Sequence, residues 1–215
     1  MGDQAVIAAT CRWVQEVVIG LNLCPFAELP MERDAIRYQV CNQGEQDAIY
    51  RALLEEMACF VELPEEQAET GLFIAPCGLE AFDDYLELLY SADQALPEAG
   101  LDGVIQLASF HPDYQFEGSD MDDPANYTNR SPFPMFHLIR EQGMAQALEN
   151  YPDPEQIPER NIRTLRNLGL AEMQRRLASI TPSAAASPRS RPPGSPAASA
   201  PSTPVDRRSR ILPGR

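Results

Sequence analysis

The stretch GLFIAP, residues 71–76, is continuously apolar and lies between a glycine and a proline. A short apolar run between two chain breakers is typical of a strand that is buried on both faces. Two other stretches are predicted as strands, IRYQVC at 36–41 and GVIQLASF at 103–110. Because the first of these alternates apolar and polar residues, we expect an edge strand there.

Helices are predicted between these three strands. Residues 46–62 and 79–96 place apolar side chains at helical spacing, and acids in the first turn of the second segment complement the helix dipole. An order of strand, helix, strand, helix, strand favours parallel strands joined by right-handed crossovers. The sequence therefore predicts an α/β fold, with a small, mainly parallel sheet of three or four strands layered with helices.

Helices are also predicted at both ends of this unit. Apolar spacing over residues 5–23 indicates one that ends at Cys24 and Pro25, because proline disfavours helix in the residue before it. Helical spacing recurs over residues 134–148, and two more helices are expected between residues 158 and 180. In this prediction His137 is a packing residue on a helix.

The composition changes at residue 181. Residues 181–215 contain eight Pro, seven Ser, six Ala and six Arg, and their only sizeable aliphatic side chains are Val205, Ile211 and Leu212. Such a segment buries too little apolar surface to offset the entropy lost on ordering. We therefore expect a single folded domain at residues 1–180 and a disordered tail at 181–215.

Charge is distributed unevenly along the chain. The net charge is −15, and because the tail has six Arg and one Asp, residues 1–180 carry −20. Residues 41–129 hold 20 acids and a single base, Arg51. A surface of this kind repels phosphates, so no nucleic-acid partner is expected for the folded domain. The absence of lysine excludes Schiff-base catalysis and a phosphate-loop lysine.

Five cysteines, an odd number without a C-x-x-C pair, indicate reduced thiols. The first residues do not form the basic and apolar segments of a signal peptide, and no segment has the roughly 20 apolar residues of a membrane span. A cytoplasmic protein without a membrane segment is therefore expected.

Several reactive side chains follow the predicted strands. Cys41, Cys77 and His111 each lie at or just beyond the carboxyl end of one strand, and a long loop at residues 111–134 begins at the same place. Ligands of open α/β sheets bind outside the carboxyl ends of the strands, and long loops in compact domains are often functional. We predict the site at this edge of the sheet.

Three chemistries remain open there. His111 and the acids of the loop offer ligands for a divalent metal, but their spacing matches no established motif. Cys41, Cys77 and His111 lack a fourth ligand for zinc. Alternatively, His111 serves as general acid or base, Cys24 as nucleophile or redox thiol, and Asp113 as the residue that orients the imidazole. The metal and the cofactor stay unassigned.

The third chemistry is anion recognition by NYTNRSP at residues 126–132. Arg130 offers a guanidinium fork, and Asn129 and Ser131 offer neutral donors, for a carboxylate or phosphate. Arg130 is also the first base after a long acidic stretch, so pairing with a neighbouring acid is the alternative reading.

Four blocks carry a resemblance to a known family: CRWVQEVVIGLNLCPFA at 11–27, GLDGVIQLASFHPDYQFEG at 100–118, NYTNRSPFPMFHLIRE at 126–141 and PERNIRTLRNLG at 158–169. Together they resemble the bacterial domain of unknown function 1415, over nearly all of residues 1–180. The resemblance implies a single domain and supplies no catalytic assignment.

The sequence thus favours an enzyme that acts on a small anionic or polar substrate at the carboxyl edge of the sheet, with His111 and Arg130 and either a thiol or a divalent metal. The alternative is a non-catalytic module that binds a small ligand, a protein partner, or haem at Cys24 and Pro25. The oligomeric state is not indicated.

Overall fold

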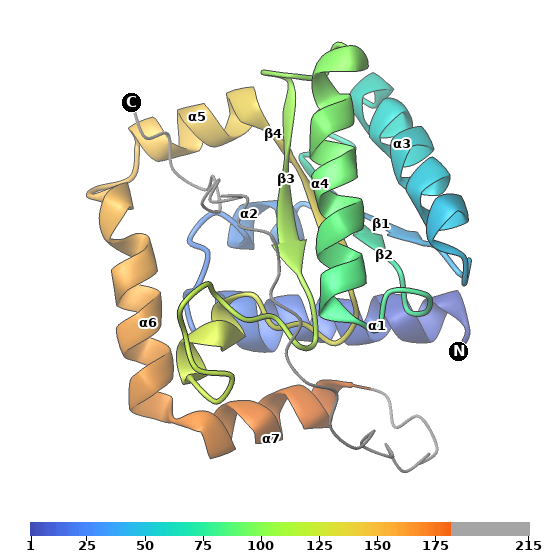
Figure 1. The fold of residues 1–215 in the computed structure, drawn as a ribbon. Coiled ribbons are helices and arrows are strands. Elements are labelled where there is room, and N and C mark those ends of the chain that lie inside the picture. The colour runs from blue at the N-terminus through green and yellow to red at the C-terminus, as the bar shows by residue number, and fades with distance from the viewer. Residues whose placement is uncertain (182–215) are drawn as a thin grey trace.

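A four-stranded sheet lies between two layers of helices in the computed structural model, which describes residues 1–181 (Figure 1). The predicted disorder of the tail therefore falls almost entirely outside the described residues. The strands are β1 (Ile36–Val40), β2 (Thr70–Ile74), β3 (Ile105–Phe110) and β4 (Met135–Arg140), in the spatial order β1-β2-β4-β3.

The α/β fold and the three predicted strands are confirmed, but the expectation of a mainly parallel sheet is wrong. β1 pairs with β2 in parallel, whereas β4 is antiparallel to both β2 and β3. Because β4 runs against both of its neighbours, β1, β2 and β3 still point in one direction. Their carboxyl ends share one edge of a mixed sheet.

The fourth strand corrects the helix predicted over residues 134–148. MFHLIR forms β4, and the helix that follows, α5, begins only at Glu141 (Glu141–Glu149). On β4, Phe136 and Leu138 are fully buried on one face, and Met135 is fully buried on the other. A strand covered on both faces lacks apolar–polar alternation, so periodicity does not distinguish it from a buried helix.

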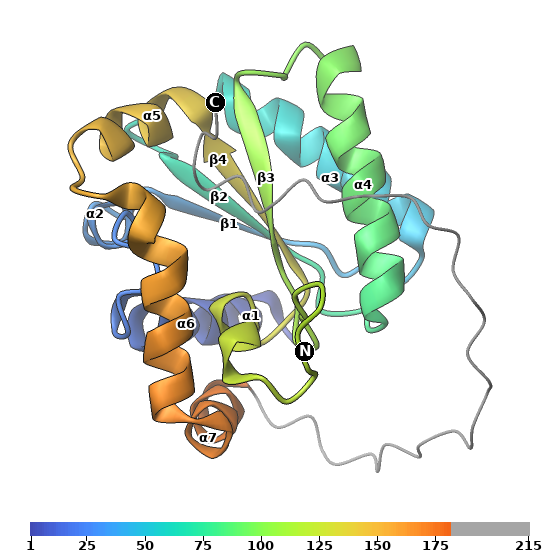
Figure 2. The ribbon, with the colours of Figure 1, turned by 60° about the vertical axis from the view of Figure 1, so that its left-hand side comes forward.

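One face of the sheet is covered by α3 (Gln46–Glu62) and α4 (Phe82–Glu98), which lie side by side in both views (Figures 1 and 2). Their buried residues pack on Phe73 and Phe136 from the sheet. The Tyr85 hydroxyl, from α4, donates to the Met135 carbonyl at 2.8 Å and accepts the Phe110 amide at 3.1 Å. This hydroxyl joins α4 to two strands.

The other face receives the two ends of the described chain (Figure 2). Its helices are α1 (Asp3–Trp13), the π-helical turn η1 (Val14–Ile19), α2 (Glu28–Glu32), α6 (Ile157–Leu168) and α7 (Leu170–Ile180), with the 3-10 turns η2 (Pro124–Thr128) and η3 (Pro154–Gln156). Trp13 and Val17 pack with Leu72 and Ile74 of β2 in a second apolar core. None of the helices within residues 1–181 is long and apolar enough to cross a membrane.

Candidate functional site

His111 lies directly after β3 and is completely buried. Its Nε2 is 2.9 Å from the Leu79 carbonyl oxygen, and the Asp113 backbone amide donates to its Nδ1 at 3.0 Å. Because a carbonyl only accepts and an amide N–H only donates, Nε2 carries the proton and Nδ1 does not. Burial lowers the pKa of His111, which favours this neutral form.

The surroundings of His111 are those of a structural residue. Its ring packs 5.2 Å, between centroids, from both Phe82 and Tyr85. Its backbone amide donates to the Asn129 carbonyl at 3.1 Å, which ties the start of the long loop to its end. No ring nitrogen is left to exchange a proton with a substrate. The catalytic role proposed for His111 stays a prediction, and this geometry favours a structural one.

Asn129 and Ser131 are also engaged within the protein. The Asn129 side-chain amide donates to the Ser109 carbonyl at 3.0 Å, and the Ser131 hydroxyl donates to the Phe133 carbonyl at 2.6 Å. Both residues are buried. Their hydrogen bonds connect the end of the loop to β3 and to the approach to β4, so the predicted ligand donors stabilise the loop.

Arg130 likewise bonds to the loop from which it projects. Its Nε donates to the Tyr114 carbonyl at 3.0 Å, one terminal nitrogen donates to the Met121 carbonyl at 2.9 Å, and its guanidinium lies 4.9 Å from the centre of the Tyr127 ring. The Trp13 indole donates to the Arg130 carbonyl at 3.1 Å. Tyr114 links His111 and Arg130 through its backbone, because its amide donates to the His111 carbonyl at 3.1 Å, and Asp113 contacts the His111 ring through its backbone amide rather than its carboxylate.

The middle of the long loop is organised by Asn126, which is fully buried. Its Oδ1 accepts from the Phe116 amide at 3.1 Å and the Ser119 hydroxyl at 2.8 Å, and its Nδ2 donates to the Asp120 carbonyl at 2.8 Å. A single buried amide thus closes the loop on itself. Sequence reasoning assigned the loop to a ligand and overlooked this internal network.

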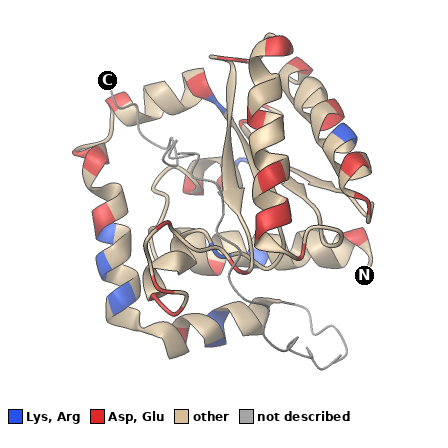
Figure 3. Cartoon of the chain, in the orientation of Figure 1, with Lys and Arg blue, Asp and Glu red and all other residues tan. Residues whose placement is uncertain are grey.

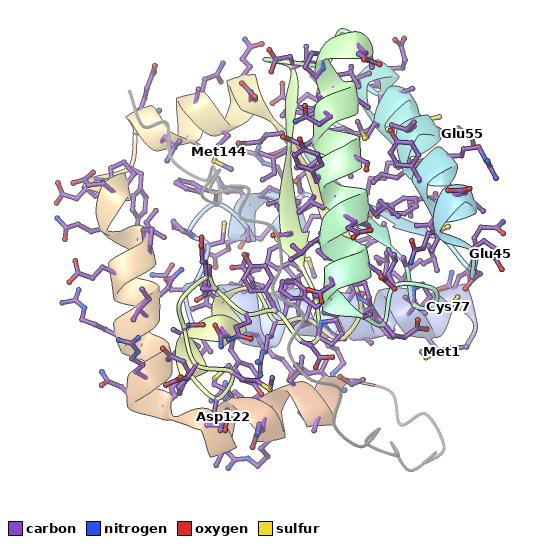
Figure 4. The ribbon with its side chains drawn as sticks, in the orientation of Figure 1. Met1, Glu45, Glu55, Cys77, Asp122 and Met144 are labelled. Atoms are coloured by element: carbon purple, nitrogen blue, oxygen red, sulfur yellow. The ribbon has the colours of Figure 1, made fainter. Side chains whose placement is uncertain are left out.

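The thiols and acids at this edge do not converge. In Figure 4 Cys77 lies beyond the end of β2, and Asp122 of the loop lies on the opposite side of the view. The Cys77 thiol is 3.5 Å from the Gln43 carbonyl, and Cys41 is buried. Within residues 1–181 no three His, Cys, Asp or Glu side chains are close enough together to hold a metal ion.

His137, which the sequence placed on a helix, lies in the middle of β4 between Leu72 of β2 and Ala108 of β3. Its Nε2 is 2.6 Å from the Thr70 hydroxyl oxygen, and that hydroxyl is 2.9 Å from the Leu138 carbonyl. A hydroxyl has one proton, so when it donates to Leu138 it accepts from Nε2–H of His137. Among the described residues, Nδ1 of His137 has no hydrogen-bond partner.

Part of the sheet face around His137 is exposed. Thr70, Gln106, Ala108, Phe110 and His137 share this face and are all partly exposed, although Leu72, Ile74 and Met135 on the same face are buried. We call these five residues the sheet-face cluster. The Phe110 ring lies 5.9 Å from the His137 ring, between centroids. Burial lowers the pKa of His137 to about 4, so the imidazole is neutral at physiological pH.

Cys24 lies in the turn between η1 and α2 and is partly buried. Burial raises the pKa of its thiol, while the backbone amides of Phe26 and Ala27 and the charge of Arg160 lower it to a smaller extent. The thiol form is therefore favoured at neutral pH, and the nucleophilic role proposed for Cys24 has no activated thiolate to support it. Arg160 itself donates to the Tyr151 hydroxyl at 2.8 Å.

Asn161, at the amino-terminal part of α6, was not singled out by the sequence. Its side chain is only 4% exposed, and its Nδ2 donates to the Leu23 carbonyl at 2.7 Å. Its Oδ1 is a buried acceptor without a partner among the described residues. An acceptor of this kind is normally satisfied by water or by a ligand.

The fold and these contacts define a mixed α/β protein with one fully engaged histidine and one neutral, partly exposed histidine on a central strand. Residues 5–175 match the family model described as "Protein of unknown function (DUF1415)", so the chain belongs to this family, as the sequence resemblance indicated. Comparison with curated proteins and with solved structures gave no match.

Proposed function

We propose that this protein binds a small polar or anionic molecule on the sheet-face cluster, and that Nδ1 of His137 accepts a hydrogen bond from it. The protonation and the hydrogen bonding of the His137 side chain support this proposal. The His137 imidazole is neutral, Thr70 holds its Nε2, and its Nδ1 has no partner within residues 1–181.

Nδ1 of His137 is open to exchange. Among the described residues Oδ1 of Asn161 is the one buried side-chain atom without a hydrogen-bond partner, so Nδ1 of His137 keeps contact with solvent and can exchange water for a ligand donor. Around the ring, Phe110 and Ala108 supply apolar contact area, and Gln106 supplies a polar group. Mostly apolar surfaces with a few placed polar groups are typical of small-molecule sites.

Catalysis by proton transfer is the second candidate function. A general base needs an imidazole held in one tautomer with a free lone pair, which is the arrangement of His137 with Thr70. With a pKa of about 4, the free protein has only a weak base. An anion bound beside the ring would favour the protonated form and raise that pKa, so an anionic substrate suits this site better than a neutral one.

The chain has only two histidines, which makes the site directly testable. Diethyl pyrocarbonate reacts with neutral imidazole nitrogens, so treatment at neutral pH should modify His137 and leave the fully buried His111 unmodified. Peptide mass spectrometry identifies the modified residue. The variant His137→Gln should lose the modification while its circular dichroism spectrum stays unchanged.

Small amides and hydroxy acids, which carry the N–H or O–H donor that Nδ1 requires, serve as probes of ligand binding in the same assay. We expect some of them to slow the modification of His137 in a saturable way, with acetate, which has no donor at neutral pH, as a control. Modification of His111 at a rate equal to that of His137, or a rate at His137 that no donor-bearing probe changes, would contradict the proposal.

A further inference from the structure

The outer surface of α4 carries two exposed apolar side chains. Leu86 is 39% exposed and Tyr90 is 50% exposed, and their spacing of four residues places them on one side of the helix. Asp83 and Glu87 are exposed on the same side. We call these four residues the α4 stripe. It lies opposite the buried side of α4, which packs on the sheet through Tyr85 and Leu88.

The α4 stripe lies in the most acidic part of the molecule. Residues 41–104 contain fifteen acids and one base, Arg51. Among the described residues, only two of these acids form an ion pair, Glu56 with Arg37 and Glu69 with Arg33. Figure 3 shows several acidic residues along α4. A partner for this surface has to be basic and has to carry apolar side chains of its own.

The same chain contains a segment of that chemistry. Residues 207–215, RRSRILPGR, hold four arginines around the apolar pair Ile211 and Leu212. They are separated from Thr181 by the 25 residues 182–206, which span roughly 80 Å when extended. A domain of this size has a radius of gyration of about 16 Å, so the segment reaches any face of its own domain.

We propose that residues 207–215 dock on the α4 stripe of their own chain. Ile211 and Leu212 cover Leu86 and Tyr90, while the arginines pair with Asp83 and Glu87 and stack on the Tyr90 ring. Individually these contacts are weak. Because the segment is tethered, its effective concentration at the stripe is on the order of millimolar, which is enough for a weak contact to be occupied.

Limited trypsin digestion of the full chain tests this docking. Trypsin cleaves after Lys and Arg, and all basic residues here are Arg. The bonds after Arg208 and Arg210 lie in the docked segment, whereas the bond after Arg189 lies outside it and serves as an internal reference. We expect the ratio of cleavage after Arg210 to cleavage after Arg189 to rise about fivefold in Leu86→Ser/Tyr90→Ser, equivalent to ~1 kcal/mol.

The same trypsin digestion tests whether the acidic residues of the α4 stripe contribute to docking. Asp83→Asn/Glu87→Gln should raise the cleavage ratio, and high salt should raise it in the wild type, because exposed ion pairs are screened. The control Leu29→Ser removes a side chain that is 56% exposed on α2, and Glu149→Gln/Glu155→Gln removes two charges elsewhere; neither should change the ratio. Circular dichroism checks that every variant is folded.

Two results would overturn the docking. The first is a cleavage ratio that is the same in the wild type and in both stripe variants. The second is protection of the Arg210 bond that increases with protein concentration, because this would make a second copy of the chain, rather than the same chain, the occupant of the stripe.

Discussion

The surroundings of the two histidines differ in one hydrogen bond. Both rings are neutral because burial lowers their pKa, and both have a neighbouring oxygen at Nε2. The Asp113 amide occupies Nδ1 of His111, whereas Nδ1 of His137 has no partner within residues 1–181. Backbone groups of Leu79 and of the long loop bind both ring nitrogens of His111, while the partly exposed position of His137 in the sheet leaves one ring nitrogen available.

The largest expected effect concerns His111. His111→Ala removes a buried ring and leaves the Leu79 carbonyl and the Asp113 amide without partners. We expect the free energy of unfolding to fall by about 4 kcal/mol. Urea denaturation measures it, and His137→Ala is the matched control. A larger loss in the His137 variant would reverse the comparison.

Acid should destabilise the protein through His137. Its pKa is about 4 in the folded state and 6.5 without burial, so the unfolded state binds more protons between these values. Stability therefore falls as the pH drops from 6.5 towards 4, by about 3 kcal/mol at most. Urea denaturation across this range should show a shallower decline in His137→Gln. Parallel curves for the two proteins would contradict the assignment.

The smallest expected effect concerns the orientation of the ring. Thr70→Val keeps the shape of the side chain and removes the hydroxyl at Nε2 of His137. We expect a loss of about 1 kcal/mol in the free energy of unfolding and a mixture of the two tautomers. Nitrogen-15 NMR of the imidazole nitrogens reports the tautomers of both histidines. The signals of His111 should not change, and a single unaltered tautomer at His137 would contradict the role of Thr70.

Much of the fold was predictable because it is encoded locally. The strand GLFIAP and the helices on either side of it have their own periodicity and chain breakers. β4 was missed because MFHLIR is apolar on both faces, and its insertion between β2 and β3 is decided by tertiary packing. With β4 predicted as helix, His137 was assigned to a packing face.

The site was harder to predict than the fold. Residue type and chain order directed attention to His111, Arg130, Asn129 and Ser131, all of which offer useful chemistry. The sequence does not reveal that each of them meets a backbone group of its own neighbourhood. Asn161 has no sequence signal at all, because its unpaired oxygen exists only where α6 packs against Leu23.

The position of β4 in the sequence also determines when the sheet can be completed during synthesis. β1 and β2 are able to pair once residue 74 has left the ribosome, but the sheet partner of β3 is β4, which emerges about thirty residues later. Until then the growing chain has an unpaired strand and an open sheet edge, both of which favour aggregation. A chain that stops before residue 135 therefore lacks the strand that joins β3 to β2 and β1.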